Sequence, residues 1–498
     1  MRLSELLREI PGAVPLDPGD PEVRGVECDT RALGPGHLFA AVRGVKADGH
    51  DFLPAAAAAG AVACLLEEER PAPGLVRVRV PDGEEALGRA AAAFWGHPSG
   101  RLKLVGITGT NGKTTAAYLL QHLLRQAGTV TGRLGTVSYD FPSGEEPAPL
   151  TTPDAPTLQR ALARMLRDGA EAVVMEVSSH ALHRKRVEGC RFSAAVFTNL
   201  TQDHLDYHGT MEAYFEAKQL LFDRYRDGAP AVVNGEDPWG RRLLESLPAP
   251  AVSFGLQSGD VRVEVREAGA WGMKGTVHHP GGACPLELPL AGEFNVRNAA
   301  AALATAAALD LDVASAAAAL AHAPQVPGRL EAVPNRRDVS VYVDYAHTPD
   351  ALDRVLEAVA PLTRGRLLCL FGCGGDRDRG KRPHMARAAA RWCDAVVLTA
   401  DNSRSEPTEA ILDEIEAGMP ADWCRVAPGD VGREPFTYAR VSDRSEAIRT
   451  AVGAARPGDT VVLAGKGHES TQTIGRSAAH FDDREEARRA LAGGEDEA

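Results

Sequence analysis

The segment Thr108–Thr115, with the sequence TGTNGKTT, contains the residue types of a phosphate-binding loop. Small residues let backbone N–H groups approach phosphate oxygens, and a helix that starts after the loop adds a partial positive charge. Lys113 can reach the β- and γ-phosphates of a nucleotide, and the Thr114 hydroxyl can bind Mg²⁺. The general pattern has glycine where this chain has Ile107, but Gly-Lys-Thr directly after an apolar run favours an ATP site over an ordinary turn. The expected ATP-binding residues of the loop are Gly109, Thr110, Asn111, Gly112, Lys113, Thr114 and Thr115.

Four more side chains could hold a metal or a reacting group. Glu176 lies at the end of the apolar run EAVVMEV, where its carboxylate suits Mg²⁺, a hard cation that prefers oxygen ligands. His204 and His208 could bind zinc from one helix face, but no third ligand follows at metalloprotease spacing. His204 is therefore interpreted as a ligand of Mg²⁺ or Mn²⁺. Lys218, judged by its local sequence alone, is typical of a solvated helix lysine.

Short apolar runs alternate with helical patterns along most of the chain, which predicts α/β structure with doubly wound, parallel sheets. Ligands bind beyond the carboxyl ends of parallel strands, and the polar clusters of this chain each follow a predicted strand. Two alanine-rich runs, 55–64 and 299–309, are expected to be packed helices. The predicted strands are 102–107, 171–177, 194–198, 231–233, 339–345, 366–371, 395–399 and 460–464. The clusters are TGTNGKTT, EVSSH, TNLTQDH, DYAHTPD, FGCGGDRDRGKRP, ADNSRSE and AGKGHE.

The length of 498 residues predicts about three domains. Boundaries are expected at the turn 97–100 and at VPGRLE, residues 326–331. These give a smaller α/β N-terminal domain (1–100), a central phosphate-loop domain (101–330) and a C-terminal Rossmann-like domain (331–498). The last residues, 492–498, are expected to form a solvated tail.

Composition and charge exclude several classes of protein. Hydrophobic residues make up 44% of the chain, which argues against global disorder, and a net charge of −13 argues against a general nucleic-acid-binding surface. No apolar run approaches the length of a membrane span, and residues 1–12 have the pattern of a short amphipathic helix rather than a signal peptide. Eight dispersed cysteines predict reduced thiols, and we expect a cytoplasmic protein.

A series of motifs, taken together, resembles the Mur ligase family, and within it the ligases that add the third residue of the peptidoglycan stem peptide. The resemblance covers nearly the whole chain, including the N-terminal CDTR and PGHLFAAVRG segments. The family also has the shortened phosphate loop, which accounts for Ile107. The motifs, in chain order, are TGTNGKTT, LTTP, MEVSSHAL, FTNLTQDHLDYHG, EAKQLLF, FNVRNAAAALA, GRLE, VDYAHTPDAL, FGCGGDRDRGKRP, DNSRSE and LAGKGHE.

The resemblance implies roles for individual residues. The N-terminal domain would hold the uridine diphosphate end of the substrate, and Lys218 would carry a CO₂-derived carbamate that binds Mg²⁺ with Thr114, Glu176 and His204. Lys113, Lys218, Glu176 and His204 would be the catalytic residues. The implied UDP-sugar-peptide contacts are Cys28, Thr30, Thr151, Thr152, Ser178, Arg184 and Arg186, although many family members have glutamine where this chain has Arg184. The implied adenine and ribose–phosphate contacts are Asn295, Arg329, Asp344 and His347.

The implied reaction is ATP-dependent amide-bond formation in peptidoglycan synthesis, and through it the protein would serve cell-wall biogenesis, cell shape, the cell cycle and division. The γ-phosphate of ATP would activate the D-Glu side-chain carboxylate of UDP-MurNAc-L-Ala-D-Glu as an acyl phosphate, and the amine of a free diamino acid would then attack. Since three domains hold the substrate parts, domain closure on binding is expected. The protein is expected to act as a monomer.

The diamino acid itself is left open by the sequence. The family pattern for meso-diaminopimelate is DNPR, and this chain has DNSR, in which Arg404 is kept and Ser403 replaces a rigid proline. Arg404 favours a substrate with a distal carboxylate, such as meso-diaminopimelate, while L-lysine and L-ornithine stay as alternatives. The implied amino-acid contacts are Arg377, Asp401, Asn402, Ser403, Arg404, Gly465 and Glu469.

Three other classes share part of this pattern. A motor or transport NTPase has the phosphate loop but does not need the N-terminal segment or the DNSR and GKGHE loops. Folylpolyglutamate synthase, a related ligase, is the nearest enzymatic alternative. A non-catalytic nucleotide-binding scaffold is disfavoured because Lys113, Thr114, Glu176 and Lys218 are all intact.

Overall fold

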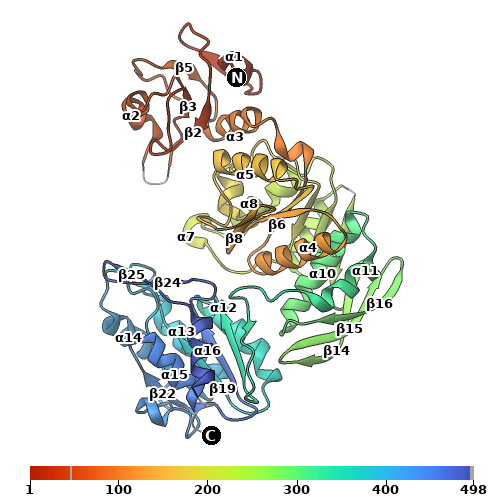
Figure 1. The fold of residues 1–498 in the computed structure, drawn as a ribbon, viewed down its shortest axis with the longest axis vertical. Coiled ribbons are helices and arrows are strands. Elements are labelled where there is room, and N and C mark those ends of the chain that lie inside the picture. Colours follow the sequence, from red (N-terminus) through yellow and green to blue (C-terminus); the bar gives the residue numbers. More distant parts are fainter. Residues whose placement is uncertain (45–46, 249, 494–498) are drawn as a thin grey trace. The chain divides into compact units, whose positions relative to one another are not determined.

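The computed structural model describes residues 1–44, 47–248 and 250–493 (Figure 1). The chain divides into two compact units. Unit 1 comprises Met1–Arg262, His278–Ala283 and Asn298–Ala319, and unit 2 comprises Val263–Val277, Cys284–Arg297 and Leu320–Ala498. Of the predicted tail, residues 494–498 lie outside the described residues.

The first part of unit 1 is a small sheet with the strand order β1-β5-β4-β3-β2, in which only the β1–β5 pair is antiparallel. Side chains alternate between two cores: α1 and α3 cover one face of the sheet, and α2 covers the other. The strands are β1 (Val14–Pro15), β2 (Gly25–Glu27), β3 (His37–Ala40), β4 (Ala63–Leu66) and β5 (Val76–Arg79). The helices are α1 (Leu3–Leu7), α2 (Leu53–Ala58), α3 (Gly83–Phe94) and the 3₁₀ turns η1 (Gly49–Phe52) and η2 (Pro98–Arg101).

The predicted helix over 55–64 is wrong beyond Ala58. Gly60 adopts a left-handed backbone, with φ of +89°, that ends the helical run. The following small apolar residues form β4, which is fully buried between β3 and β5. Ala63 and Leu65 of this strand point into one core of the sheet, and Cys64 and Leu66 point into the other.

The central sheet of unit 1 has the order β13-β12-β11-β6-β10-β7-β8-β9, parallel from β13 to β7 and antiparallel at β8 and β9. Its strands are β6 (Lys103–Thr108), β7 (Thr131–Leu134), β8 (Ser138–Phe141), β9 (Gly144–Pro147), β10 (Ala172–Glu176), β11 (Ala194–Phe197), β12 (Ala231–Asn234) and β13 (Ala251–Gly255). Its helices are α4 (Lys113–Gln126), α5 (Ala155–Arg167), α6 (Ser179–His183), α7 (Leu205–His208), α8 (Met211–Asp223), α9 (Pro238–Ser246) and α11 (Val313–Ala319).

Helices cover both faces of this sheet. Leu104, Val173 and Phe197 point into a core shared with α5 and α8, while α4 packs against β10, β7 and β6 outside that core (Figure 1). The alternation of buried side chains along fully apolar strands explains why both faces need a helical cover. The run 299–309 lies within α10 (Glu293–Ala308) up to its end, which confirms that predicted helix.

Unit 2 contains a seven-stranded sheet with the order β17-β18-β23-β19-β20-β22-β21, parallel except for the β17–β18 pair. Its strands are β17 (Glu331–Ala332), β18 (Ser340–Asp344), β19 (Leu367–Phe371), β20 (Ala395–Leu398), β21 (Cys424–Arg425), β22 (Thr437–Arg440) and β23 (Thr460–Ala464). Helices α12 (Pro349–Val359), α13 (Lys381–Trp392) and α14 (Thr408–Glu416) cover one face, and α15 (Arg444–Ala454) and α16 (Asp483–Ala492) cover the other.

A further strand continues the central sheet: β14 (Val261–Gly269) pairs in parallel with β13 at Val261 and Arg262. A two-stranded hairpin, β24 (Thr471–Ile474) and β25 (Ser477–His480), follows the AGKGHE segment in unit 2. Strand β14 (Val261–Gly269) begins in unit 1, and most of β14, β15 (Gly272–His279) and β16 (Gly282–Leu288) belongs to unit 2. Three 3₁₀ turns complete the list: η3 (Leu320–His322), η4 (Ala360–Leu362) and η5 (Pro428–Asp430).

The structure confirms the predicted α/β class and the parallel, doubly wound sheets. Each of the eight predicted strands is present, and all seven polar clusters follow the carboxyl end of a strand. All eight cysteines are free thiols. Among the described residues, no helix is long and apolar enough to cross a membrane.

Candidate functional site

The phosphate loop connects β6 to α4 and is braced by the segment after β11. Asn111 N donates to Asn199 Oδ1 at 2.9 Å, and Thr198 Oγ1 donates to Asn111 O at 2.6 Å. Gly109 has φ of +148°, and a Cβ at this position would lie 1.9 Å from Thr198 Oγ1, so only glycine fits. Lys113 Nζ donates to the loop carbonyls of Gly109 and Thr110 at 2.9 and 2.8 Å.

Glu176 is a buried carboxylate at the end of β10, beside the start of α4. Its Oε2 accepts hydrogen bonds from Thr114 Oγ1 and Thr136 Oγ1, both at 3.0 Å, and its Oε1 accepts one from Thr136 N at 2.8 Å. A carboxylate and a hydroxyl at hydrogen-bond distance form an oxygen donor set that fits Mg²⁺, which takes one or two carboxylates plus phosphate oxygens. No group of three or more His, Cys, Asp or Glu residues could hold a metal ion within the described residues.

Lys218 is buried on α8, so its interpretation as a solvated lysine from local sequence is wrong. The side chain is 1% exposed, and Nζ donates to Gly109 O at 2.9 Å, the carbonyl that Lys113 also contacts. Burial and the neighbouring charge of Lys113 lower the pKa of Lys218 well below its usual value. The shift favours the neutral form of the amine, which lies against the phosphate loop through its contact with Gly109 O.

Histidine rings gather between α6 and α7. The His180 ring lies 4.8 Å from His204 and 5.5 Å from His208, and burial lowers the pKa of all three imidazoles, that of His208 to about 4. His208 Nε2 contacts Ser179 Oγ at 3.0 Å, so this nitrogen is engaged by a hydroxyl rather than directed with His204 to one metal. The zinc alternative is not supported by this arrangement.

The LTTP segment and the EVSSH segment meet next to Glu176. Thr152 Oγ1 donates to Glu176 O at 2.9 Å and accepts from Ser178 N at 3.0 Å, while Arg186 Nη1 donates to Thr152 O at 3.1 Å. Thr151 Oγ1 lies 3.1 Å from Thr136 Oγ1. Four of the seven implied sugar-peptide contacts therefore lie close to Glu176.

The other three lie toward the N-terminal sheet. Arg184 is engaged by Glu84, at 2.5 Å, and by the carbonyl of Arg43, at 2.6 Å. Cys28 and Thr30 follow β2, as a strand-end site requires. Burial and nearby carboxylates raise the pKa of the Cys28 thiol to about 12, so it is a neutral side chain.

In unit 2, the implied nucleotide contacts lie around the end of β18. Asp344 accepts hydrogen bonds from the backbone N–H groups of Leu330 and Ala346 at 2.6 and 2.8 Å, and its burial raises its pKa. The Arg329 guanidinium lies 5.1 Å from the Tyr345 ring centre. His347 contacts the Tyr345 carbonyl at 2.8 Å, and Asn295 Nδ2 donates to Ala291 O at 2.8 Å.

A buried lysine organises the implied amino-acid site of unit 2. Lys466 is 0% exposed, and its Nζ lies 3.4 Å from Glu469 Oε2, 3.9 Å from Asp401 Oδ1 and 2.6 Å from Thr471 O. Asn402 Nδ2 donates to Glu469 Oε2 at 2.9 Å. Lys466 was not among the predicted site residues, although it lies inside the AGKGHE cluster.

The DNSR loop places Arg404 beside the FGCGG loop. Arg404 has φ of +51°, and its Nη1 donates to Gly375 O at 2.7 Å. Ser403 is fully buried, and its Oγ lies 2.7 Å from Thr408 Oγ1 at the start of α14. Gly465 N donates to Asp344 O at 3.0 Å, which joins this loop set to the nucleotide contacts. Arg377 is exposed, and its Nη1 donates to the carbonyl of the neighbouring Asp376 at 3.2 Å.

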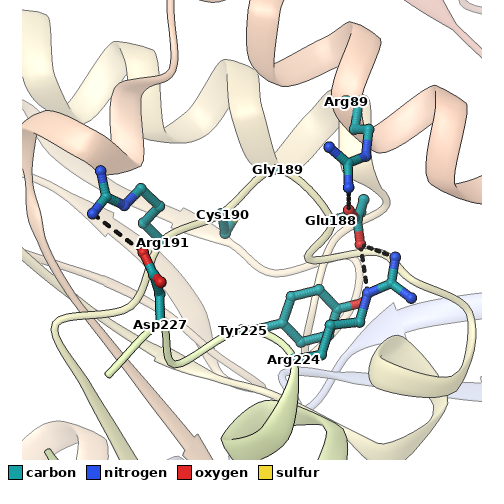
Figure 2. Close-up of a pocket in the computed structure, with 8 residues that line it drawn as sticks. All are labelled: Arg89, Glu188, Gly189, Cys190, Arg191, Arg224, Tyr225 and Asp227. Atoms are coloured by element: carbon teal, nitrogen blue, oxygen red, sulfur yellow. Dashed lines mark hydrogen bonds and ion pairs between the residues drawn. The ribbon is translucent and has the colours of Figure 1, made fainter. Parts of the chain in front are cut away.

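A separate cavity of about 590 Å³ in unit 1 contains none of the predicted site residues (Figure 2). Its arginines are already partnered: Glu188 pairs with Arg89 at 3.2 Å and with Arg224 at 2.9 Å, and Arg191 pairs with Asp227 at 3.3 Å. These pairs make it a nearly charge-balanced junction between α3, the loop after α6 and the end of α8.

Comparison with protein families finds three matches along the chain. Residues 22–95 match "Mur ligase family, catalytic domain", residues 107–306 match "Mur ligase middle domain", and residues 328–467 match "Mur ligase, glutamate ligase domain".

Individual proteins and structures extend this result. The UDP-N-acetylmuramoyl-L-alanyl-D-glutamate–2,6-diaminopimelate ligase of Geobacter metallireducens is 46% identical, covering 98% of this chain and 97% of the relative. The protein of that name from Thermosynechococcus vestitus is also 46% identical and covers 97% of each chain. A solved structure of a ligase with that name matches with a TM-score of 0.72 at 32% identity, covering 99% of this chain and 100% of that one. The chain belongs to the Mur ligase family.

Proposed function

We propose that this chain is an ATP-dependent ligase that joins meso-diaminopimelate to UDP-MurNAc-L-Ala-D-Glu in peptidoglycan synthesis. The observation that carries the proposal is the buried Lys218 beside a phosphate loop whose Thr114 contacts Glu176. A phosphate loop alone would serve many reactions, but the lowered pKa of a buried lysine beside it favours the amine form that a carbamate-forming ligase needs. The names of full-length relatives supply the substrate class.

The reaction follows from charge. The D-Glu side-chain carboxylate is a poor acyl donor, so its oxygen first attacks the γ-phosphorus of ATP and releases ADP. The amine of the diamino acid then attacks the acyl carbon, the tetrahedral intermediate expels phosphate, and the nitrogen loses a proton. Lys113, now on the carbonyls of Gly109 and Thr110, would turn its ammonium to the transferring phosphoryl oxygens.

Thr114 and Glu176, with His204 and a modified Lys218, would hold Mg²⁺, and the ion would supply positive charge that offsets the charge of the phosphate groups. We propose that the Lys218 amine attacks CO₂, forming an N–C bond and losing one proton, to give an anionic carbamate. Its lowered pKa favours the neutral, nucleophilic amine that this step needs.

The three segments would divide the substrates between them. Segment 1–100, with Cys28 and Thr30, would hold the uridine diphosphate, and Thr151, Thr152, Ser178 and Arg186 of segment 101–330 would hold the sugar-peptide. Segment 331–498 would bind the amino acid. Closure of the lobes on the complete set of substrates is part of the proposal, because the reacting groups start on different segments.

The diamino acid would be recognised by charge at both ends. Asp401 Oδ1 is buried and accepts no hydrogen bond within the described part of the chain, so it is an acceptor suited to a substrate ammonium. Glu469 would provide a second acceptor, and Arg404 would clamp the distal carboxylate. Lysine and ornithine lack that carboxylate and would leave the Arg404 guanidinium without its partner.

The decisive experiment measures phosphate release with ATP, Mg²⁺ and UDP-MurNAc-L-Ala-D-Glu, adding meso-diaminopimelate, L-lysine or L-ornithine in turn. We expect rapid release only with meso-diaminopimelate, and formation of the UDP-MurNAc-tripeptide by mass spectrometry. Release with lysine or ornithine alone would reassign the amine donor. Turnover without any amino acid, or only with a folate substrate and glutamate, would contradict the proposed function.

A further inference from the structure

Thr136, in the loop after β7, contacts both sides of the candidate reaction centre. We propose that Thr136 is a positioning residue that holds Glu176 and links the binding of the sugar-peptide substrate at Thr151 to the binding of the divalent cation at Glu176. The inference rests on the proposed function, because it takes Thr151 as a substrate contact.

The contacts form a continuous chain of hydroxyl groups. Thr151 Oγ1 lies 3.1 Å from Thr136 Oγ1, which lies 3.0 Å from Glu176 Oε2. The same Oε2 atom accepts from Thr114 Oγ1 at 3.0 Å. The start of α4 and the loop after β7 therefore meet on one buried carboxylate, and the segment after β9 reaches it through Thr136.

The chemistry of the groups sets the direction of these hydrogen bonds. An ionised carboxylate can only accept, so Thr136 uses its single hydroxyl hydrogen on Glu176. The Thr136 oxygen must then accept from Thr151, and the Thr151 oxygen keeps both of its lone pairs to accept from a substrate donor. A substrate N–H or O–H that donates to Thr151 would strengthen each following hydrogen bond through polarisation.

The backbone around Thr136 is fitted closely to Glu176. A Cβ on Gly135 would lie 2.3 Å from Glu176 Oε1, so glycine is needed for the Thr136 N–H to reach that oxygen at 2.8 Å. The other end of the chain is held too, because Tyr139 Oη donates to Leu150 O at 2.7 Å next to Thr151. Both carboxylate oxygens are thus oriented by one residue, leaving their remaining lone pairs to a cation.

The consequence is a linkage between two binding events. If occupancy of Thr151 improves the placement of Glu176, the sugar-peptide substrate tightens cation binding, and the cation tightens substrate binding by the same factor. Groups that orient a metal ligand typically change metal affinity by 10- to 100-fold when removed. We expect Thr136 to act in this way.

The test uses the full chain with ADP and Mn²⁺ as a paramagnetic probe for the Mg²⁺ position, and measures the Mn²⁺ dissociation constant by electron paramagnetic resonance. Thr136→Val keeps the shape and the backbone N–H but removes the hydroxyl. We expect about tenfold weaker Mn²⁺ binding for T136V. Thr136→Ser, which restores the hydroxyl, should bind as the unchanged protein does. Thr131→Val is a matched control, because the Thr131 hydroxyl donates only to the nearby carbonyl of Thr129.

The linkage is tested by repeating the titration with saturating UDP-MurNAc-L-Ala-D-Glu. In the unchanged protein the substrate should tighten Mn²⁺ binding about fivefold or more, and in T136V and in Thr151→Val this gain should disappear. Equal gains in T136V and the unchanged protein would overturn the linkage, and equal Mn²⁺ affinity without substrate would overturn the positioning role. Failure of the unchanged protein to form a tripeptide would contradict the proposed function instead, and the Mn²⁺ titration without substrate would still test Thr136.

Discussion

The phosphate-loop edge of the sheet in unit 1, with Glu176 and Lys218, differs from the implied amino-acid edge of the sheet in unit 2, with Lys466 and Glu469, in the partners of its ionisable side chains. Both lie beyond the carboxyl ends of parallel strands. In unit 1, Glu176 is held by hydroxyls and a backbone amide, and Lys218 by a backbone carbonyl. In unit 2, Lys466 faces Glu469 and Asp401, and the buried Arg382 pairs with Glu406 and Glu414, each at 2.8 Å.

The difference suggests two tasks. Neutral partners hold Glu176 in place without cancelling its charge, so the carboxylate stays available to a cation. Paired charges in unit 2 fix the loops before any ligand binds, and a zwitterionic ligand can replace one ion pair by another of similar energy. Unit 1 is thus suited to catalysis and unit 2 to selection.

Replacing Lys218 should have the largest effect, and it tests whether the phosphate-loop edge of unit 1 serves catalysis. We expect Lys218→Met to lower kcat for phosphate release by about 10³-fold, the scale for losing a key electrostatic group. Folded stability should not fall, because a buried amine that prefers to be neutral is replaced by an apolar chain of similar length. The measurements are steady-state kinetics and calorimetric unfolding; retention of a tenth of the activity would contradict a catalytic role.

The same variant carries a pH signature in CO₂-free buffer. The folded-state pKa of Lys218 is lowered, so between that value and its ordinary pKa the unfolded chain binds more protons than the folded one. The free energy of unfolding should therefore gain a rising contribution with pH through this window. In K218M that contribution should be absent, and identical pH slopes would count against the buried neutral amine.

The Arg404→Ala variant tests whether unit 2 selects the amino acid. A bidentate guanidinium–carboxylate contact contributes about 2–3 kcal/mol, so KM for meso-diaminopimelate should rise roughly 30- to 150-fold while kcat changes little. L-Lysine, which has no distal carboxylate, should be used as poorly as before. Equal losses for both amino acids would mean that Arg404 supports the loop and does not read the substrate.

The sequence predicted the two edges well because strands and their following clusters are local patterns. Runs of mainly apolar residues predicted β6, β10, β19 and β23 to within one residue at each end, and each polar cluster follows in the chain. The helix predicted over 55–64 is wrong beyond Ala58, because an alanine-rich run is compatible with either a helix or a buried strand. Alanine is both a good helix former and a small buried strand residue, so residues after Gly60 were assigned to a helix.

Long-range contacts explain the missed site residues. Lys218 looks solvated in its own helix because nothing local reveals that α8 faces the Gly109 carbonyl. Thr136 lies in the segment LGTVSY after β7, and its position at the end of a strand is the one feature of the sequence that could indicate a site residue. Its importance depends on loops from β10 and the LTTP segment meeting on it. Lys466 could have been found, because it lies within the AGKGHE cluster.

A smaller effect is expected from removing the contact between Ser403 and Thr408, which lies within unit 2. The two hydroxyls lie 2.7 Å apart and tie the DNSR loop to the start of α14. Thr408→Val should cost about 1 kcal/mol, which is about a fivefold rise in KM for meso-diaminopimelate, and Thr408→Ser should restore it. A change confined to kcat, or no rescue by serine, would argue against a loop-positioning role.

The smallest effects concern one histidine beside each edge. Burial is the main cause that lowers the pKa of both His208 in unit 1 and His468 in unit 2 to about 4. His180, His183, Lys218 and His204 add to the shift at His208, and Arg329 and Arg484 add to it at His468. Since an unfolded histidine titrates near 6.5, the unfolded chain binds more protons between about pH 6.5 and 4, and stability should fall as the pH falls through that window.

Replacing either histidine by glutamine should flatten this fall in the calorimetric unfolding temperature between pH 7 and 4.5. The exposed His97→Gln variant serves as the control, with an unchanged slope. H208Q should also shift the acid limb of phosphate release, because the His208 ring lies 5.1 Å from the ring of Tyr214, whose hydroxyl contacts Thr110 of the phosphate loop. H468Q should alter KM for the amino acid and leave that limb in place. A shift of the acid limb in H468Q alone would reverse the assignment of catalysis to unit 1 and selection to unit 2.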